Sequence, residues 1–280
     1  MRRFHLNCGT VLPPLGVCLF GVGQPFRRAK IVTHCILLES DDGLLLIDTG
    51  MGREDLEQPD AFMRAMLWFG GSSRNLRETA VAQVEMLGYK RDDVQHIALT
   101  HFHYDHASGL PDFPNAKVHI LKDEFDAVQQ PDDLNERWVY RRKHWSHKPK
   151  WVVHECRGEQ WYGFERSPMI ELGSVSFCFV PLPGHTRGHA GVALKTNTGW
   201  LFHCGDAYTY HGEVDPINPR QAPYAHTLRP IVNLNYAFRN IGRHSRRLQI
   251  LARQYGDEVT LTNSHDPVEY QKLVGIGGKI

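Results

Sequence analysis

The chain of 280 residues lacks several features that would each indicate a class of protein. Its six cysteines are scattered without a Cys-x-x-Cys pair, so we expect buried free thiols rather than a disulfide framework. No apolar run approaches the roughly 20 residues of a membrane-spanning helix, which argues against a membrane partner. The 32 Lys and Arg residues are balanced by 31 Asp and Glu residues. This balance argues against a nucleic-acid partner, because such binding usually needs a basic face.

A secretory signal is also missing from the first residues. Met-Arg-Arg at the start is followed by His5, Asn7 and the pair Pro13-Pro14, with neither a clean apolar core nor a small-residue cleavage site. We therefore expect a soluble, cytoplasmic protein. With 41% hydrophobic residues, the chain is long enough to bury a sizeable core, and we expect a single domain over residues 1–280.

One short segment, Thr100 to His106, concentrates side chains that bind metals. It holds three histidines and one aspartate, directly after the apolar run Val94 to Leu99. Four such groups cannot all face one way on a strand or a helix, so they converge only in a tight loop. Loops at the ends of buried strands are where sites form in α/β proteins. Because neutral imidazole and carboxylate suit zinc and its neighbours, the segment predicts a metal site.

Three further segments repeat the pattern of an apolar strand followed by a metal-capable residue in a turn. They end at His185, Asp206 and His265. A single histidine after a strand is more often a hydrogen-bonded structural group. Because all of these residues follow predicted strands in one chain, we interpret them as parts of the same site.

Strands and helices alternate in both halves of the chain, which indicates sheets covered by helices. Two apolar runs, 31–38 and 44–47, predict a hairpin through the turn Asp41-Asp42-Gly43. Apolar residues at helical spacing predict helices over 73–87 and 230–254. Further strands are expected over 94–99, 117–121, 169–172, 175–180, 192–194, 201–204 and 259–261.

The order of these metal-capable residues resembles the metallo-β-lactamase superfamily. The resemblance runs from Ile31 to Asp266 and leaves 130–165 uncovered. It rests on the following motifs: Asp48-Thr49-Gly50, His101-x-His103-x-Asp105-His106, Gly184-His185-Thr186-x-Gly188-His189, Asp206 and His265. It implies an α/β fold, a four-layer αββα sandwich of mixed sheets, with a two-metal site along one edge.

The resemblance also implies a set of ligands for two divalent metal ions. Zinc is the expected metal, and manganese, iron and cobalt are alternatives that the same ligands accept. Carried over by position, the first ion would be held by His101, His103 and His185, the second by Asp105, His106 and His265, and Asp206 would bridge them. True β-lactamases of the family commonly have cysteine in place of Asp206, which argues against antibiotic hydrolysis.

Such a site has the chemistry of a hydrolase. Two ions about 3.5–4 Å apart share a water and lower its pKa toward 7, which supplies a hydroxide nucleophile at neutral pH. Asp105 is a candidate for relaying a proton to the leaving alkoxide. Tyr208 and Tyr210 follow Asp206 closely. Either is a candidate donor to the oxyanion, and Tyr208 is the preferred one of the two. Asp48 is a candidate for orienting a ligating imidazole, whereas His189 is expected to hold its own turn.

The substrate prediction comes from a narrower resemblance to lactonases that open acyl-homoserine lactones. These enzymes carry a tyrosine shortly after their bridging aspartate, and the chain also resembles them in His265-Asp266 and in Asn7-Cys8-Gly9-Thr10. The main hypothesis is a dinuclear hydrolase that opens a small-molecule lactone or ester. A mononuclear iron persulfide dioxygenase and a thioester hydrolase of the glyoxalase II type remain as alternatives. The complete second ligand set disfavours the dioxygenase, and the short tail after His265 disfavours glyoxalase II.

Two segments have more than one interpretation. Residues 130–165 are rich in Trp and Tyr and fit the alternation poorly, so we interpret them as an insertion. The insertion forms either a wall of the substrate pocket or a segment packed on the body or on a second subunit. The apolar run 63–69 is a core helix, a mobile lip or a dimer contact, so a homodimer is a further prediction. The histidines at 144, 147 and 154 are expected to be solvated.

Overall fold

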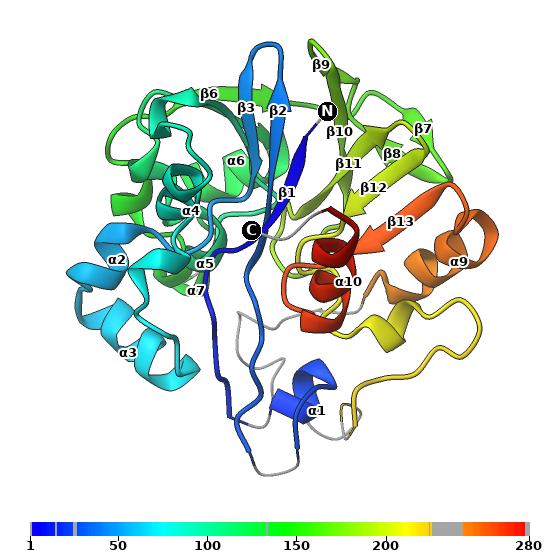
Figure 1. Cartoon of the computed structure of the whole chain (residues 1–280), viewed down its shortest axis with the longest axis horizontal. Coiled ribbons are helices and arrows are strands. Elements are labelled where there is room, and N and C mark those ends of the chain that lie inside the picture. Colours follow the sequence, from blue (N-terminus) through cyan, green and yellow to red (C-terminus); the bar gives the residue numbers. More distant parts are fainter. Residues whose placement is uncertain are drawn as a thin grey trace.

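The computed structural model describes residues 2–14, 16–24, 27–132, 134–223, 225 and 243–277, and two mixed β-sheets lie at its centre (Figure 1). The six-stranded sheet has the order β1-β2-β3-β4-β5-β6. Its strands are β1 Arg3–Asn7, β2 His34–Ser40, β3 Gly43–Ile47, β4 Val94–Ala98, β5 Lys117–Leu121 and β6 Lys150–His154. The five-stranded sheet has the order β13-β12-β11-β10-β9. Its strands are β9 Ile170–Leu172, β10 Val175–Pro181, β11 Ala190–Thr196, β12 Gly199–His203 and β13 Val259–Thr262.

Smaller elements complete the described part of the chain. A two-stranded sheet pairs β7 Glu159–Trp161 with β8 Phe164–Arg166. The α-helices are α1 Gly16–Phe20, α2 Arg53–Glu57, α3 Ala61–Gly70, α4 Ala80–Met86, α5 Tyr104–Ala107, α6 Lys122–Gln129, α7 Leu134–Val139, α9 Ser245–Tyr255 and α10 Pro267–Gly277. Short 3-10 turns are η1 Leu76–Glu78, η2 Arg91–Asp93, η3 Leu110–Asp112, η4 Arg142–Trp145 and η5 His211–Val214.

The two sheets pack face to face, and each has helices on its outer side (Figure 1). Strand β2 is apolar on both faces because both faces are covered. Ile36 and Leu38 point to the core between the sheets, whereas Leu37 points to the core under α4 and α6. A third core lies between the second sheet and α9, with Leu248 and Leu251 as contributions of the helix. The predicted four-layer αββα arrangement is confirmed.

Most predicted elements are confirmed, and the differences have local causes. The predicted hairpin is β2 and β3, in antiparallel register through the expected turn. The helix predicted over 73–87 is divided, because the Thr79 side chain accepts a hydrogen bond from Ala82 N and begins α4 after the turn η1. The first half of the helix predicted over 230–254 lies outside the described residues, and its described end is α9.

The aromatic segment 130–165 is joined to the body of the molecule. It contributes β6, an edge strand parallel to β5 that the sequence pattern did not predict. Trp145 and Trp151 pack against Phe102, with ring centroids 4.9 and 6.0 Å away. His144 is buried and lies 2.9 Å from the Asp55 carboxylate, so the expectation that it is solvated is wrong. These contacts place part of the segment behind the histidine loop.

Other expectations about the body of the molecule have mixed outcomes. Cys156 is half-buried and the other five cysteines are buried, and all six are free thiols as predicted. In α3, Met63 and Leu67 are core residues, but Trp68 is 80% exposed and Phe69 57% exposed. No helix in the described part of the chain is both long enough and apolar enough to span a lipid bilayer. The dimer hypothesis stays a prediction.

Candidate metal centre

The histidine loop begins where β4 ends. His101 comes three residues after Ala98, the last residue of β4, and His103 is the N-cap of the single-turn helix α5. His106 N donates to His103 O at 3.0 Å, and this turn places the His106 ring at a tilt to the His101 ring, with the centroids 4.0 Å apart. All three histidines are buried, whereas the Asp105 side chain keeps 17% of its surface exposed. The loop therefore concentrates its imidazoles inward, as the sequence predicted.

A first group of side chains joins this loop to the turn after β10. The ligand atoms of His101, His103 and His185 all lie within 4.8 Å of one another. The His185 ring is 4.8 Å from the His101 ring and 4.5 Å from the His103 ring, both edge to face. Nitrogen lone pairs of three different imidazoles thus converge on one point, although they come from positions about 80 residues apart in the chain.

A second group lies beside the first, and Asp206 stands between the two. Asp105, His106 and His265 bring their ligand atoms within 4.8 Å of one another. Asp206 Oδ1 is 3.3 Å from His106 Nε2, and Asp206 Oδ2 is 3.1 Å from His265 Nε2. The same Oδ2 lies 3.3 Å from His185 Nε2 in the first group. One carboxylate therefore contacts both histidine groups, which is the placement that a bridging ligand needs.

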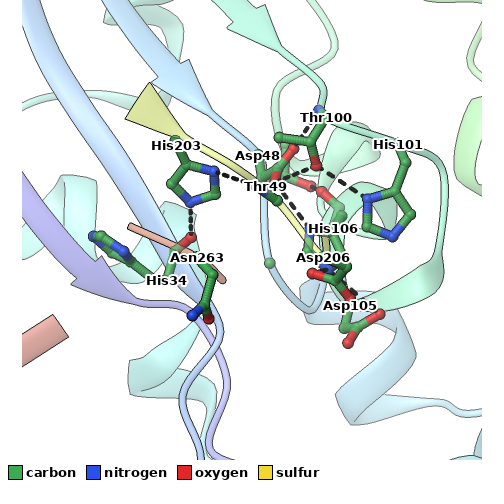
Figure 2. Close-up of polar contacts among 12 residues, drawn as sticks. His34, Asp48, Thr49, Thr100, His101, Asp105, His106, His203, Asp206 and Asn263 are labelled. Carbon is green, nitrogen blue, oxygen red and sulfur yellow. Dashed lines mark hydrogen bonds and ion pairs between the residues drawn. The ribbon is translucent and has the colours of Figure 1, made fainter. Parts of the chain in front are cut away.

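Asp48 supports the loop from behind (Figure 2). Its carboxylate accepts hydrogen bonds from Thr100 N and Thr100 Oγ1, both at 2.8 Å, and contacts His106 Nδ1 at 2.9 Å. Asp48 is fully buried and has a φ of 55°, a left-handed conformation that is strained for a non-glycine residue. Because the bond to Asp48 uses Nδ1 of His106, the other ring nitrogen faces Asp206. The prediction that Asp48 orients an imidazole agrees with this geometry.

Backbone carbonyl groups orient other imidazoles. His265 Nδ1 lies 2.8 Å from Val32 O, which leaves Nε2 to face the cluster. His189 has its Nδ1 3.0 Å from Leu182 O, and its Nε2 accepts a hydrogen bond from Asp206 N at 2.9 Å. Both ring nitrogens of His189 are therefore used, and the residue holds its turn as predicted.

The imidazoles of the first group are held neutral. Burial lowers the pKa of His101 and of His185 well below the usual value, with the neighbouring imidazoles acting in the same direction. Burial also lowers the pKa of His103, to about 4. A neutral imidazole offers a lone pair, so these three side chains are in the protonation state that a metal ligand requires.

In the second group, the pKa values of the imidazoles are raised and not lowered, because Asp206 lies beside them. Burial disfavours its charged form, but the neighbouring His265 and His106 hold the pKa of Asp206 well below its usual range. Burial alone would lower the pKa of His106 and His265, yet the pKa of each is raised by the nearby carboxylates, Asp206 first and then Asp105. The carboxylate of Asp206 and these two imidazoles therefore stabilise one another's charged forms.

The residues fit a pair of divalent cations. Several buried atoms of the cluster have no hydrogen-bond partner among the described residues: His101 Nε2, His106 Nε2, both nitrogens of His185, and Asp206 Oδ1. Buried polar atoms normally have partners, so a cluster of them facing one another requires an explanation. Imidazole nitrogen and carboxylate oxygen are ligands of zinc and of related divalent ions. A cation bound by each histidine group would satisfy these atoms, apart from one of the two His185 nitrogens.

The two tyrosines predicted as oxyanion donors have other partners. The Tyr208 hydroxyl is fully buried and donates to the Glu269 carboxylate at 3.0 Å. The Tyr210 hydroxyl accepts a hydrogen bond from Arg220 Nε at 2.8 Å. Among the described contacts, neither phenol reaches the seven clustered side chains. The Tyr208 hydroxyl donates its only proton to Glu269, so that proton is not available to an oxyanion.

One buried carboxylate near the cluster was missed from the sequence. Glu124 lies in the first turn of α6, is fully buried, and accepts hydrogen bonds from Phe102 N and Thr186 Oγ1. Burial raises the pKa of Glu124 to about 7, although these donors favour its charged form. Acidic residues are common in the first turn of any helix, so the sequence carried no signal that distinguished this one.

Comparison with known proteins agrees with the fold and the cluster. The family profile described as "Metallo-beta-lactamase superfamily" matches residues 30–121. A protein of Mycobacterium tuberculosis named as a probable metallo-hydrolase is 35% identical over 282 residues, which cover 97% of this chain and 82% of that protein. The chain belongs to the metallo-β-lactamase superfamily, and it is similar to this probable metallo-hydrolase over most of its length.

More distant similarities lead to lactonases. An N-acyl homoserine lactonase of Bacillus cereus is 24% identical over 178 residues, which cover 63% of this chain and 64% of that enzyme. A solved structure of an N-acyl homoserine lactone hydrolase, with the product N-hexanoyl-L-homoserine at its catalytic metal centre, has a TM-score of 0.65 at 18% identity. It covers 97% of this chain and 95% of the other. At that identity, the similarity establishes the shared fold.

Proposed function

We propose that the protein is a dinuclear metal-dependent hydrolase that opens ester bonds, with N-acyl homoserine lactones as its substrates. The observation that carries this proposal is the placement of Asp206, whose carboxylate contacts His106 and His265 on one side and His185 on the other. A carboxylate between two convergent histidine groups suits a pair of cations.

Each cation has a complete set of ligands on this chain. The first site consists of His101, His103 and His185, the second of Asp105, His106 and His265, and Asp206 is shared. When bound, two zinc ions supply Lewis acidity toward the substrate carbonyl and a water of lowered pKa as nucleophile. The ligand types also accept manganese, iron or cobalt.

The other functional side chains move or hold protons. Asp105 is the most exposed carboxylate of the cluster, and its Oδ2 lies 3.6 Å from His265 Nε2. It is therefore placed to pass a proton to the leaving alkoxide. Of the two tyrosines, Tyr210 is the better oxyanion donor. Its oxygen accepts from Arg220, so its own proton stays available, whereas the Tyr208 proton is donated to Glu269.

A lactone substrate is supported by the relatives and by the aspartate at position 206. The homoserine lactonase of Bacillus cereus matches across 63% of this chain, and the solved homoserine lactone hydrolase matches nearly all of it in fold. The surroundings of the proposed ligand His265 are apolar on one side. The buried ring of Phe20 in α1 packs edge to face against the His265 ring, with centroids 6.2 Å apart.

The test combines metal analysis with a substrate panel. The purified chain is expected to hold two zinc equivalents and to open acyl-homoserine lactones faster than aryl esters or thioesters. His265→Ala should lose one equivalent and most of the turnover, whereas the control His147→Ala, at a half-buried histidine outside the cluster, should retain both. Two bound zinc equivalents without turnover of any lactone would refute the substrate assignment. A single iron, with oxygen consumed on a thiol substrate, would replace the proposal with a persulfide dioxygenase.

A further inference from the structure

A buried glutamate connects the two loops that carry the first histidine group. Glu124 Oε1 accepts a hydrogen bond from Phe102 N at 2.8 Å. Glu124 Oε2 accepts from Thr186 Oγ1 at 2.6 Å and from Gly188 N at 3.2 Å. The carboxylate is fully buried, so these three donors take the place of water around it.

The donors to Glu124 lie close to the proposed metal ligands in the sequence. Phe102 lies between His101 and His103, and Thr186 directly follows His185. The three imidazoles of the first group are therefore attached to backbone that Glu124 holds from one point. At the base of these loops, Ala190 N also donates to Thr100 O at 3.0 Å. That bond aligns the strands, whereas Glu124 reaches the segments that bear the imidazoles.

The close packing around Glu124 makes this connection rigid. A Cβ atom added to Gly188 would lie 1.9 Å from Glu124 N, so the backbone of the turn touches the first turn of α6. On the other side, the Phe102 ring packs edge to face against Trp145 at 4.9 Å. Neither loop can move away from α6 without breaking these contacts.

We propose that Glu124 is a positioning residue for the first metal site. This proposal rests on the proposed function. Glu124 holds the three imidazoles of the first group in the convergent arrangement that a cation requires, through its hydrogen bonds to Phe102, Thr186 and Gly188. Partners of this kind affect metal affinity because a ligand set that must be reassembled binds more weakly than one already in place. The effect of Glu124 is therefore on metal affinity more than on the free energy of unfolding.

The variant Glu124→Gln tests this directly. Glutamine has the same shape and keeps one acceptor oxygen, but its NH₂ group faces donors that need an acceptor. Zinc affinity of the full chain, measured by competition with a chromophoric chelator, should fall about 10- to 100-fold at one of the two sites. The Co²⁺-loaded variant should also show an altered visible absorption spectrum, which reports the geometry of the remaining ligands.

A matched control separates positioning from general stability. Asp55 is another buried carboxylate, which pairs with Lys143 and His144 and, among the described contacts, makes no hydrogen bond to either histidine loop. Asp55→Asn should lower the melting temperature and leave zinc affinity within twofold of the wild type. Glu124→Gln should lower zinc affinity even when its melting temperature matches that of Asp55→Asn.

A second variant keeps the test decisive if Glu124→Gln fails to fold. Thr186→Val removes one of the three hydrogen bonds at nearly constant volume, and should lower zinc affinity by a smaller factor. Wild-type zinc affinity at both sites in either folded variant would overturn the proposal. Because the readout is zinc binding, a chain that binds two zinc ions but opens no lactone would refute the proposed function alone.

Discussion

A row of three imidazoles, two of them buried and one half-buried, predicts that acid destabilises the folded chain. His96, His119 and His154 occupy neighbouring parallel strands, and His119 contacts each of the other two at 2.9 Å between ring nitrogens. The row packs against Phe177 and Phe179 of the opposite sheet. Each neutral imidazole has one N–H donor and one acceptor nitrogen, so the row is satisfied only without extra protons.

The sign of the effect follows from the pKa of His119. Burial, followed by the neighbouring His154 and His96 and by Lys117, lowers this pKa to about 3. The unfolded chain binds the proton below its ordinary pKa of about 6.5, and the folded chain does not bind it until about pH 3. The free energy of unfolding is therefore unaffected above pH 6.5 and decreases as the pH falls below that value. Between pH 7 and pH 5, His119 alone accounts for a loss of about 2 kcal/mol.

The assay compares the wild type with His119→Gln by denaturant unfolding at pH 7 and pH 5, with chelator present so that metal release adds nothing. Glutamine supplies a donor and an acceptor without titrating. The variant should lose about 2 kcal/mol less than the wild type between the two pH values. Val118→Ala, on the same strand, is the control and should keep the wild-type difference. Equal losses in wild type and His119→Gln would refute the reasoning.

Further predictions concern the proposed site. Asp48→Asn should lower zinc affinity at the second site about 10- to 100-fold, because an amide cannot accept from both Thr100 and His106, and chelator competition measures this. Tyr210→Phe should lower kcat for a lactone roughly 100-fold with KM little changed, whereas Tyr208→Phe should keep kcat and lower the free energy of unfolding by about 1–3 kcal/mol. The opposite ranking in steady-state kinetics would reassign the donor. When free zinc is held at 100 times its dissociation constant, removing it with a chelator should lower the free energy of unfolding by about 2.7 kcal/mol for each site. A melting curve unaffected by chelator would contradict the ligand assignment.

The sequence predicted those parts of the site that depend only on residues close together in the chain. Each clustered histidine or aspartate follows an apolar strand within a few residues, and the ends of these strands, which belong to both sheets, meet in space. Thus Thr100 to His106, His185, Asp206 and His265 were identified in advance, and the structure brings them together. Their role as ligands remains a prediction.

What the sequence did not predict depends on contacts between distant residues. Tyr208 follows Asp206 closely, but its hydroxyl is bound by Glu269, 61 residues later. His144 looks like a surface residue in a basic run, but Asp55 pairs with it across 89 residues. Strand β6 has a short apolar centre between Lys150 and His154, and its pairing with β5 defines it. The pattern of neighbouring residues in a sequence does not identify partners that lie far away in the chain.

The most direct test of the central claim is a crystal structure of the zinc-soaked protein with anomalous scattering recorded at the zinc edge. We predict two peaks, one within bonding distance of His101, His103 and His185, the other of His106 and His265, with an Asp206 oxygen on each. A single peak, or an Asp206 side chain turned away from both histidine groups, would contradict the account.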